Sequence, residues 1–161
     1  MTRRSSSQVG LFAAQISEQI QRLRPLAGPQ GGPGEMQQVD LRRAVMATRL
    51  LGGSARILNL EALHVFLDEL LDWLQRIEQS RNELTTSQTL ILESVIELED
   101  AIFQDLDRSG DQAPDLDHFA TQIDDLTGLI QRDASSMDPR EKKLNGSSPM
   151  QAASVPQSPL A

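Results

Sequence analysis

The chain of 161 residues contains no cysteine and has few aromatic side chains, with one tryptophan, four phenylalanines and no tyrosine. The absence of cysteine excludes a disulfide framework and a thiolate metal site, and leaves the redox compartment undetermined. Because aromatic residues make up only 3% of the chain, a hydrophobic core has to be built from Leu, Ile, Val and Ala. That composition suits packed helices.

Long apolar runs are also lacking. Nowhere do about eighteen apolar residues follow one another, and the charged N-terminus Met-Thr-Arg-Arg-Ser-Ser-Ser is not followed by the apolar segment of a signal peptide. We therefore expect a cytoplasmic protein that does not bind membranes. Runs of alternating apolar and β-branched residues, which would indicate strands, are missing as well.

Apolar residues instead recur at steps of three and four in several segments, the pattern of amphipathic helices. The sequence predicts an all-α fold, an up-and-down four-helix bundle with a fifth C-terminal helix. We assign residues 7–133 to this bundle and residues 1–6 to a disordered N-terminus. Residues 134–161, rich in Pro, Ser, Ala and Gln, bury too little apolar surface to fold and form a disordered tail or linker.

Local signals set the expected helix ends. The first helix should begin with Ser7 as its N-cap and end before Pro25, because proline interrupts the helical hydrogen bonds. A flexible loop over residues 27–35 follows, with Asp40 as N-cap of the second helix. Asn59 is expected to cap a third helix that runs to about Ser80.

The fourth helix should open at Thr85 or Thr86, where Gln88 completes a capping box. Residues 108–114 form a turn, and a fifth helix carries the apolar stripe of Leu116, Phe119, Ile123, Leu126 and Ile130. The many carboxylates of the fourth helix are interpreted as a solvated face, because they lie on several sides of the helix and lack the spacing of a calcium loop. We expect no metal and no cofactor.

The net charge of −8 is unevenly distributed. Residues 1–58 carry a net charge of +5, whereas residues 59–133 carry −14. The two halves are expected to attract each other and to present solvated faces. Because the basic residues are not interleaved with aromatic ones, nucleic acid is not expected as a partner.

The second helix has two distinct faces on a wheel of about 100° per residue. Its expected inward face comprises Leu41, Ala44, Val45, Thr48, Leu51 and Ala55. Arg42, Arg49 and Arg56 recur every seven residues along one flank, and Met46, Leu50 and Gly53 face outward. This surface is interpreted either as a docking surface for a partner or as a solvated flank with incidental apolar residues.

The sequence of residues 48–60, Thr-Arg-Leu-Leu-Gly-Gly-Ser-Ala-Arg-Ile-Leu-Asn-Leu, resembles the signature of the histidine phosphotransfer (HPt) domains of bacterial two-component signalling. The similarity is best over residues 41–74. The order of helices looks most like the N-terminal phosphotransfer domain of chemotaxis-type histidine kinases. The matching positions are Leu51, Gly53, Ser54, Ala55, Leu58 and Leu60.

The residues that carry the chemistry of that family are replaced in this chain. Arg49 stands at the position of the phosphorylated histidine, Gly52 at that of the lysine, and Val65 is aligned with the glutamate that orients the imidazole ring. A guanidinium group stays protonated and has no free lone pair, so Arg49 cannot accept a phosphoryl group.

The resemblance therefore implies a pseudo-phosphotransfer adaptor, not an enzyme, which binds a response-regulator receiver domain or a histidine kinase without carrying phosphate. Two alternatives remain open. The first is a helical scaffold, with a homodimer as one form, that associates through Phe66, Trp73 or the acidic helices, although Phe66 and Trp73 are expected to pack against a neighbouring helix. The second is an active phosphotransfer protein that uses His64 or His118.

Overall fold

The computed structural model describes residues 2–27, 34–109 and 116–137. These residues form five α-helices and one short 3-10 helix, without a strand among them, so the predicted all-α class is confirmed. The elements are α1 (Thr2–Ala27), α2 (Gly34–Ile57), α3 (Glu61–Ser80), α4 (Thr86–Ser109), η1 (Asp117–Phe119) and α5 (Ala120–Met137).

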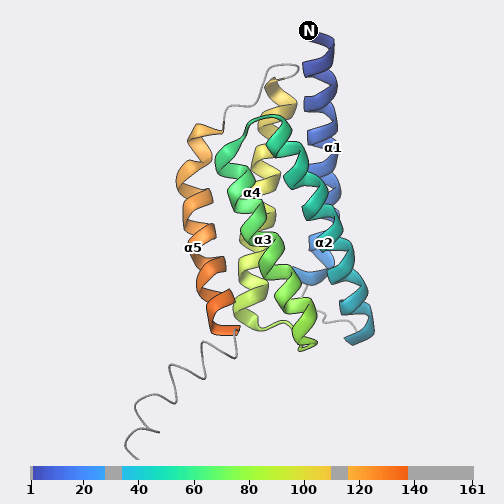
Figure 1. Cartoon of the computed structure of the whole chain (residues 1–161), viewed down its shortest axis with the longest axis vertical. Coiled ribbons are helices and arrows are strands. Elements are labelled where there is room, and N and C mark those ends of the chain that lie inside the picture. The colour runs from blue at the N-terminus through green and yellow to red at the C-terminus, as the bar shows by residue number, and fades with distance from the viewer. Residues whose placement is uncertain (1, 28–33, 110–115, 138–161) are drawn as a thin grey trace, which may run out of the picture.

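The helices run up and down the bundle, and the last one closes it (Figure 1). Helix α1 packs against α2 and α4, and α2 packs against α3. Helices α3 and α4 hardly approach each other, and α5 lies against both of them. The fifth helix therefore fills a gap in the bundle, and α2 lies on the opposite side of the molecule from α5 (Figure 1).

The apolar stripes predicted from the sequence form one continuous core. The inward face predicted for α2 is buried. The apolar stripe that the sequence predicts for α4 is buried as well, and it comprises Ile91, Val95, Leu98, Ile102 and Leu106. Phe66 and Trp73 are both completely buried, which confirms that they pack within the bundle. Their burial contradicts the alternative in which these two side chains mediate association with another molecule.

The capping box of α4 is present as predicted. The backbone N–H of Thr85 donates to Gln88 Oε1 at 3.0 Å, and the N–H of Gln88 donates to Thr85 Oγ1 at 3.0 Å. These two bonds satisfy N–H groups that have no partner within the helix.

Asn59 ends α2 and does not cap α3. It adopts the left-handed conformation with φ of 60°, and its N–H donates to Arg56 O while the N–H of Leu60 donates to Ala55 O. This pattern is a Schellman motif, which asparagine tolerates better than most residues. The N-cap of α3 is Leu60, which provides no side-chain cap.

Several predicted helix ends are wrong because local signals permit a helix boundary without requiring one. Helix α1 begins at Thr2, so Ser7 and the predicted disordered segment lie within it from residue 2 onward. Pro25 also lies inside α1, in its last turn, where few hydrogen bonds remain to be lost. Burial of Leu26 and Ala27 holds that turn against the core.

Helix α2 likewise begins before its predicted cap. It starts at Gly34, so that Asp40 is an interior residue and only residues 28–33 of the predicted loop lie outside the described chain. Gln37 Nε2 donates to the carbonyl of Asn82 at 3.1 Å, which ties this early part of α2 to the segment that follows α3. Arg108 belongs to α4, and residues 110–114 of the predicted turn lie outside the described residues.

Helix α5 extends beyond the predicted end of the domain at residue 133. It runs to Met137, whose Sδ accepts a hydrogen bond from Gln88 Nε2 at 3.3 Å. Residues 134–137 thus belong to the bundle and not to a tail. The remainder of the predicted tail, residues 138–161, lies outside the described part of the chain.

One carboxylate joins α5 to both helices that it separates. Asp133 Oδ2 accepts a hydrogen bond from Trp73 Nε1 on α3 at 2.7 Å and another from Gln88 Nε2 on α4 at 3.0 Å. Because the Trp73 side chain is completely buried, its N–H has no access to water. Asp133 therefore satisfies a donor that would otherwise be costly to bury.

We expect Asp133→Ala to lower the free energy of unfolding by about 2 to 3 kcal/mol, because it leaves the buried indole N–H without an acceptor. Asp133→Asn is the matched control, since its amide oxygen can still accept both bonds, and it should lose less than half as much. Chemical denaturation followed by the fluorescence of Trp73, the single tryptophan, measures both variants. Equal losses in the two variants would contradict this role.

Candidate functional site

The outward face of α2 carries the largest exposed apolar side chains of that helix. Met46 is 62% exposed and Leu50 60%, and Gly53 is also exposed, as the sequence analysis predicted. Ile57, which is 65% exposed, continues the same stripe three turns after Met46 and was missed. The four residues Met46, Leu50, Gly53 and Ile57 are called the α2 ridge below.

The three arginines beside the α2 ridge are all exposed but differ in their partners. Arg42 Nε pairs with Glu78 Oε2 on α3 at 3.2 Å. Arg56 donates to His64 Nε2, with distances of 3.0 Å from Nε and 2.7 Å from Nη2. Arg49 has no hydrogen bond or ion pair to any residue that the structure describes. Its charge is therefore available to an external group.

A small cavity of about 200 Å³ lies next to Arg49, between α2 and α3. Gly52 and Gly53 form part of its lining, together with Arg56 and, from α3, Leu67 and Asp68. A Cβ atom at Gly53 would meet nothing within 4 Å, and one at Gly52 would approach only Leu67 Cβ, at 3.8 Å. Because glycine has no side chain, Gly52 and Gly53 leave this side of α2 uncovered.

The acidic residue near Arg49 is Asp68 and not a residue at position 65. Val65, aligned above with the glutamate of the HPt family, is 47% exposed and does not line the cavity. Asp68 does line it, and its Oδ2 lies 3.3 Å from His64 Nε2. The sequence offered no signal for Asp68, because the register of α3 against α2 is set by packing.

The two histidines occupy different environments. His64 Nε2 already receives the guanidinium of Arg56, so in this arrangement its lone pair is engaged. His118 lies on η1, where its ring is tilted by 39° against that of Phe119 with centroids 4.1 Å apart. Its Nε2 lies 3.8 Å from Asp105 Oδ1. Neither histidine lines the cavity beside Arg49.

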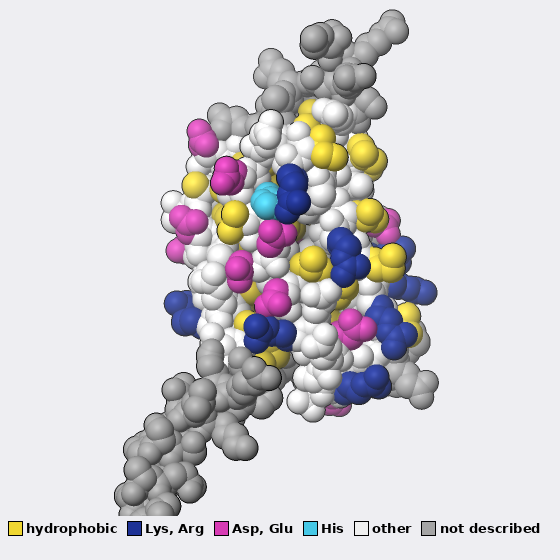
Figure 2. Space-filling model, viewed as in Figure 1, with side chains coloured by type: hydrophobic (Ala, Val, Ile, Leu, Met, Phe, Trp, Pro, Cys, Tyr) yellow, Lys and Arg dark blue, Asp and Glu magenta, His cyan; other side chains and the backbone are white. Residues whose placement is uncertain are grey.

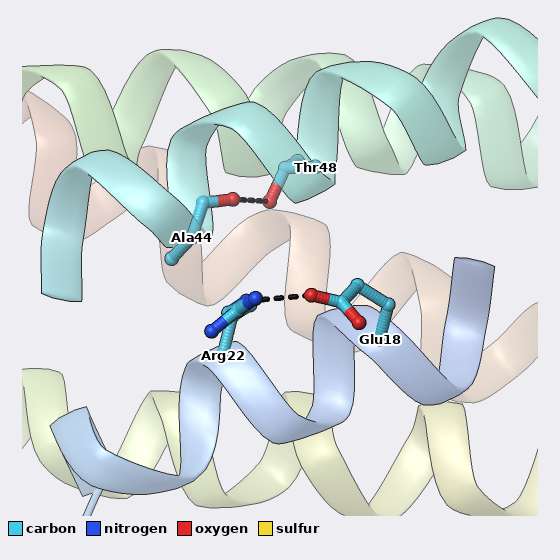
Figure 3. Close-up of polar contacts among 4 residues, drawn as sticks. All are labelled: Glu18, Arg22, Ala44 and Thr48. Carbon is cyan, nitrogen blue, oxygen red and sulfur yellow. Dashed lines mark hydrogen bonds and ion pairs between the residues drawn. The ribbon is translucent and has the colours of Figure 1, made fainter. Parts of the chain in front are cut away.

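Three polar side chains in contact with one another lie inside the core, on the inward side of α2. Gln19 of α1, Thr48 of α2 and Glu99 of α4 are each no more than 1% exposed. Thr48 Oγ1 donates to the carbonyl of Ala44 at 2.7 Å (Figure 3) and lies 2.5 Å from Gln19 Nε2. Figure 3 also shows the neighbouring surface of α1, where Arg22 Nε donates to Glu18 Oε2 at 2.6 Å.

Gln19 and Glu99 can pair in two ways that differ by one proton. The other end of the Gln19 amide lies 2.5 Å from Glu99 Oε2, so a protonated Glu99 donates to Gln19 Oε1 while Gln19 Nε2 donates to Thr48. An ionised Glu99 requires the amide to turn over, so that its N–H donates to the carboxylate and its oxygen accepts from Thr48. Thr48 then gives up its bond to Ala44.

Glu99 corrects the prediction that the acids of α4 form a solvated face. Glu93, Glu97 and Asp107 are exposed, but Glu99 is buried. Burial without a cationic partner raises the pKa of the Glu99 carboxyl well above its usual range, because the charged form is poorly solvated in the core. The protonated arrangement is thereby favoured.

Two further properties bear on the kind of site that the chain offers. Within residues 2–27, 34–109 and 116–137, His, Asp and Glu side chains nowhere gather in threes as a metal ion would need. None of the helices in these ranges is long and apolar enough to cross a membrane.

The fold and these surfaces define an all-α helical bundle whose second helix exposes apolar residues and arginines. No protein-family model, curated protein or solved structure matches the chain.

We expect the stability of the protein to fall as pH rises from about 4.3, the ordinary glutamate value, through the raised pKa of Glu99. In this interval the folded state holds a proton that the unfolded state has released, so the free energy of unfolding decreases with pH. Glu99→Gln should remove this component and keep the uncharged hydrogen-bond pattern. Thermal unfolding as a function of pH, compared with the exposed control Glu97→Gln, tests the expectation. A wild-type profile parallel to that of Glu99→Gln would contradict it.

Proposed function

We propose that the protein is a non-catalytic adaptor of bacterial two-component or chemotaxis-like signalling that acts in the cytoplasm. It binds a response-regulator receiver domain, or a histidine kinase, through the exposed face of α2 and carries no phosphate. The proposal combines the HPt-like signature of residues 48–60 with the surface chemistry of the helix that contains it.

The observation that carries the proposal is the state of Arg49. This residue stands where the resemblance puts the phosphorylated histidine, and in the structure it is exposed, unpaired among the described residues and beside an open cavity. A buried or paired arginine at that position would serve packing alone. An exposed and unpaired one offers a fixed positive charge to a partner.

The surroundings of Arg49 add the apolar contact area that a protein interface needs. Met46 lies about one turn before it and Leu50 directly follows it, and both are more than half exposed. Receiver domains resemble one another in presenting an acidic, metal-binding pocket to the matching helix of HPt domains. A guanidinium surrounded by apolar side chains is complementary to such a pocket.

Arg49→Glu is expected to weaken binding to a cognate receiver domain about tenfold or more, because it replaces attraction with repulsion at the centre of the surface. Arg24→Glu is the matched control, since it makes the same charge change at an exposed arginine of α1 that does not line the cavity beside Arg49. Calorimetric titration against a panel of receiver domains from the same genome measures both. Wild-type affinity should also fall with added salt, because exposed charges are screened over about 8–10 Å. Unchanged binding by Arg49→Glu would remove the basis of the proposal.

No phosphoryl group should be transferred to the chain. After incubation with a phosphorylated receiver domain at neutral pH, at which phosphohistidine survives, intact-mass spectrometry should show the unmodified mass. A mass increase of one phosphoryl group would instead favour an active phosphotransfer protein, and His64→Gln and His118→Gln would then identify the acceptor.

A further inference from the structure

A groove of about 440 Å³ lies between α4 and α5. Residues at steps of three and four line it from both helices, with Leu90 57% exposed and Leu129 40% exposed. A groove between two helices is the shape into which the side chains of a third helix pack. Its lining includes Ser87, Leu90 and Ser94 from α4, and Leu129, Arg132 and Ser136 from α5.

Acidic side chains border this groove. Glu93 and Glu97 of α4 are exposed, and each follows a groove residue by one helical turn. Asp125 of α5, also exposed, precedes Leu129 by one turn. A partner for this groove therefore has to present apolar side chains accompanied by positive charges. Arg132, which lines the groove, repels a positively charged partner. The partner is therefore held mainly by the apolar contacts and by the acidic border.

The α2 ridge has those properties and lies on the opposite side of the same molecule. Its apolar residues follow one another at helical steps, and Arg42, Arg49 and Arg56 accompany them along the flank. Helix α2 contacts α1 and α3, whereas the groove lies between α4 and α5. Figure 2 shows the dark blue side chains gathered mainly over α2 and the acidic ones mainly toward α3 and α5.

We infer that the α2 ridge of one copy of the chain docks into the α4–α5 groove of a second copy. Opposite charge selects this occupant, because arginines accompany the apolar ridge whereas acids border the groove. Gly53, whose Cβ position meets nothing within 4 Å, allows the backbone of α2 to approach the groove closely.

The two surfaces lie on opposite sides of one molecule, so the contact is heterologous. Each copy uses its ridge for one neighbour and its groove for another, which gives a head-to-tail chain, or a ring where the rotation between copies closes, and not a symmetric dimer. With few exposed apolar residues on either side, the association is weak, with a dissociation constant in roughly the micromolar to millimolar range. This inference does not rest on the proposed adaptor function.

The test uses two variants of the full 161-residue chain that each block one surface. Leu50→Asp places a carboxylate in the ridge, facing the acidic border of the groove. Leu90→Arg places a guanidinium in the groove, facing the arginines beside the ridge. Both side chains are more than half exposed in the wild type, so both variants should fold, and this is checked by circular dichroism and thermal unfolding.

Sedimentation velocity at increasing concentration should show wild-type species larger than a dimer, and these should shrink with added salt. Each variant alone should remain monomeric. An equimolar mixture should associate, because the intact groove of Leu50→Asp meets the intact ridge of Leu90→Arg. At the remaining contact, the carboxylate and the guanidinium that the two variants introduce attract each other. Only a head-to-tail contact restores association on mixing.

Other results overturn the inference. A wild-type chain that stays monomeric at every concentration excludes self-association through these surfaces. Association of Leu90→Arg alone shows that the groove is not the partner of the ridge, and a mixture that stays monomeric indicates a symmetric contact. No receiver domain is present in these samples, so their outcome is separate from the test of the adaptor function.

Discussion

The two hydrogen bonds to Asp133 join the three helices that meet where the bundle closes. Helices α3 and α4 hardly approach each other, and Trp73, the largest core side chain, projects its N–H toward the gap between them. In a chain with so few aromatic residues, this one indole fills space that several smaller side chains would have to share. Its polar atom then needs an acceptor from α5, and the same oxygen also binds Gln88 of α4. Asp133 Oδ2 thus links α3, α4 and α5.

Much of this fold could be predicted from periodicity because burial on a helix repeats every 3.6 residues. The inward face of α2, the stripe of α4 and the Thr85–Gln88 capping box each follow from residues close in sequence. Helix ends were less predictable. Pro25 and Asp40 are legitimate boundary signals, yet the chain continues as a helix past Pro25 and before Asp40, where burial of Leu26 and the contact of Gln37 with Asn82 stabilise the extra turns.

The candidate site was predicted in part, for a similar reason. The exposure of Met46, Leu50 and the arginines depends only on the register of α2. The surroundings of Glu99 and Asp68 depend instead on where other helices pack. Glu99 of α4 meets Gln19 of α1, and Asp68 of α3 lines the cavity beside Arg49. Nothing distinguishes these carboxylates from their neighbours along the chain. Contacts between distant segments therefore decide which of many acids has a particular role.

The separation of charge along the chain becomes a separation in space, because the basic first segment supplies α2 and the acidic later segment supplies α4 and α5. The proposed partner binding and the inferred self-association therefore both use the α2 ridge, and one ridge holds one occupant at a time. A symmetric dimer through α2 would hide both ridges. An open head-to-tail chain instead always leaves one ridge free at its end and one groove free at the other. As concentration rises, the inferred self-association lowers the number of free ridges but leaves one at the end of every open chain. Under the proposed function, a receiver domain with higher affinity would shorten the chains from that end.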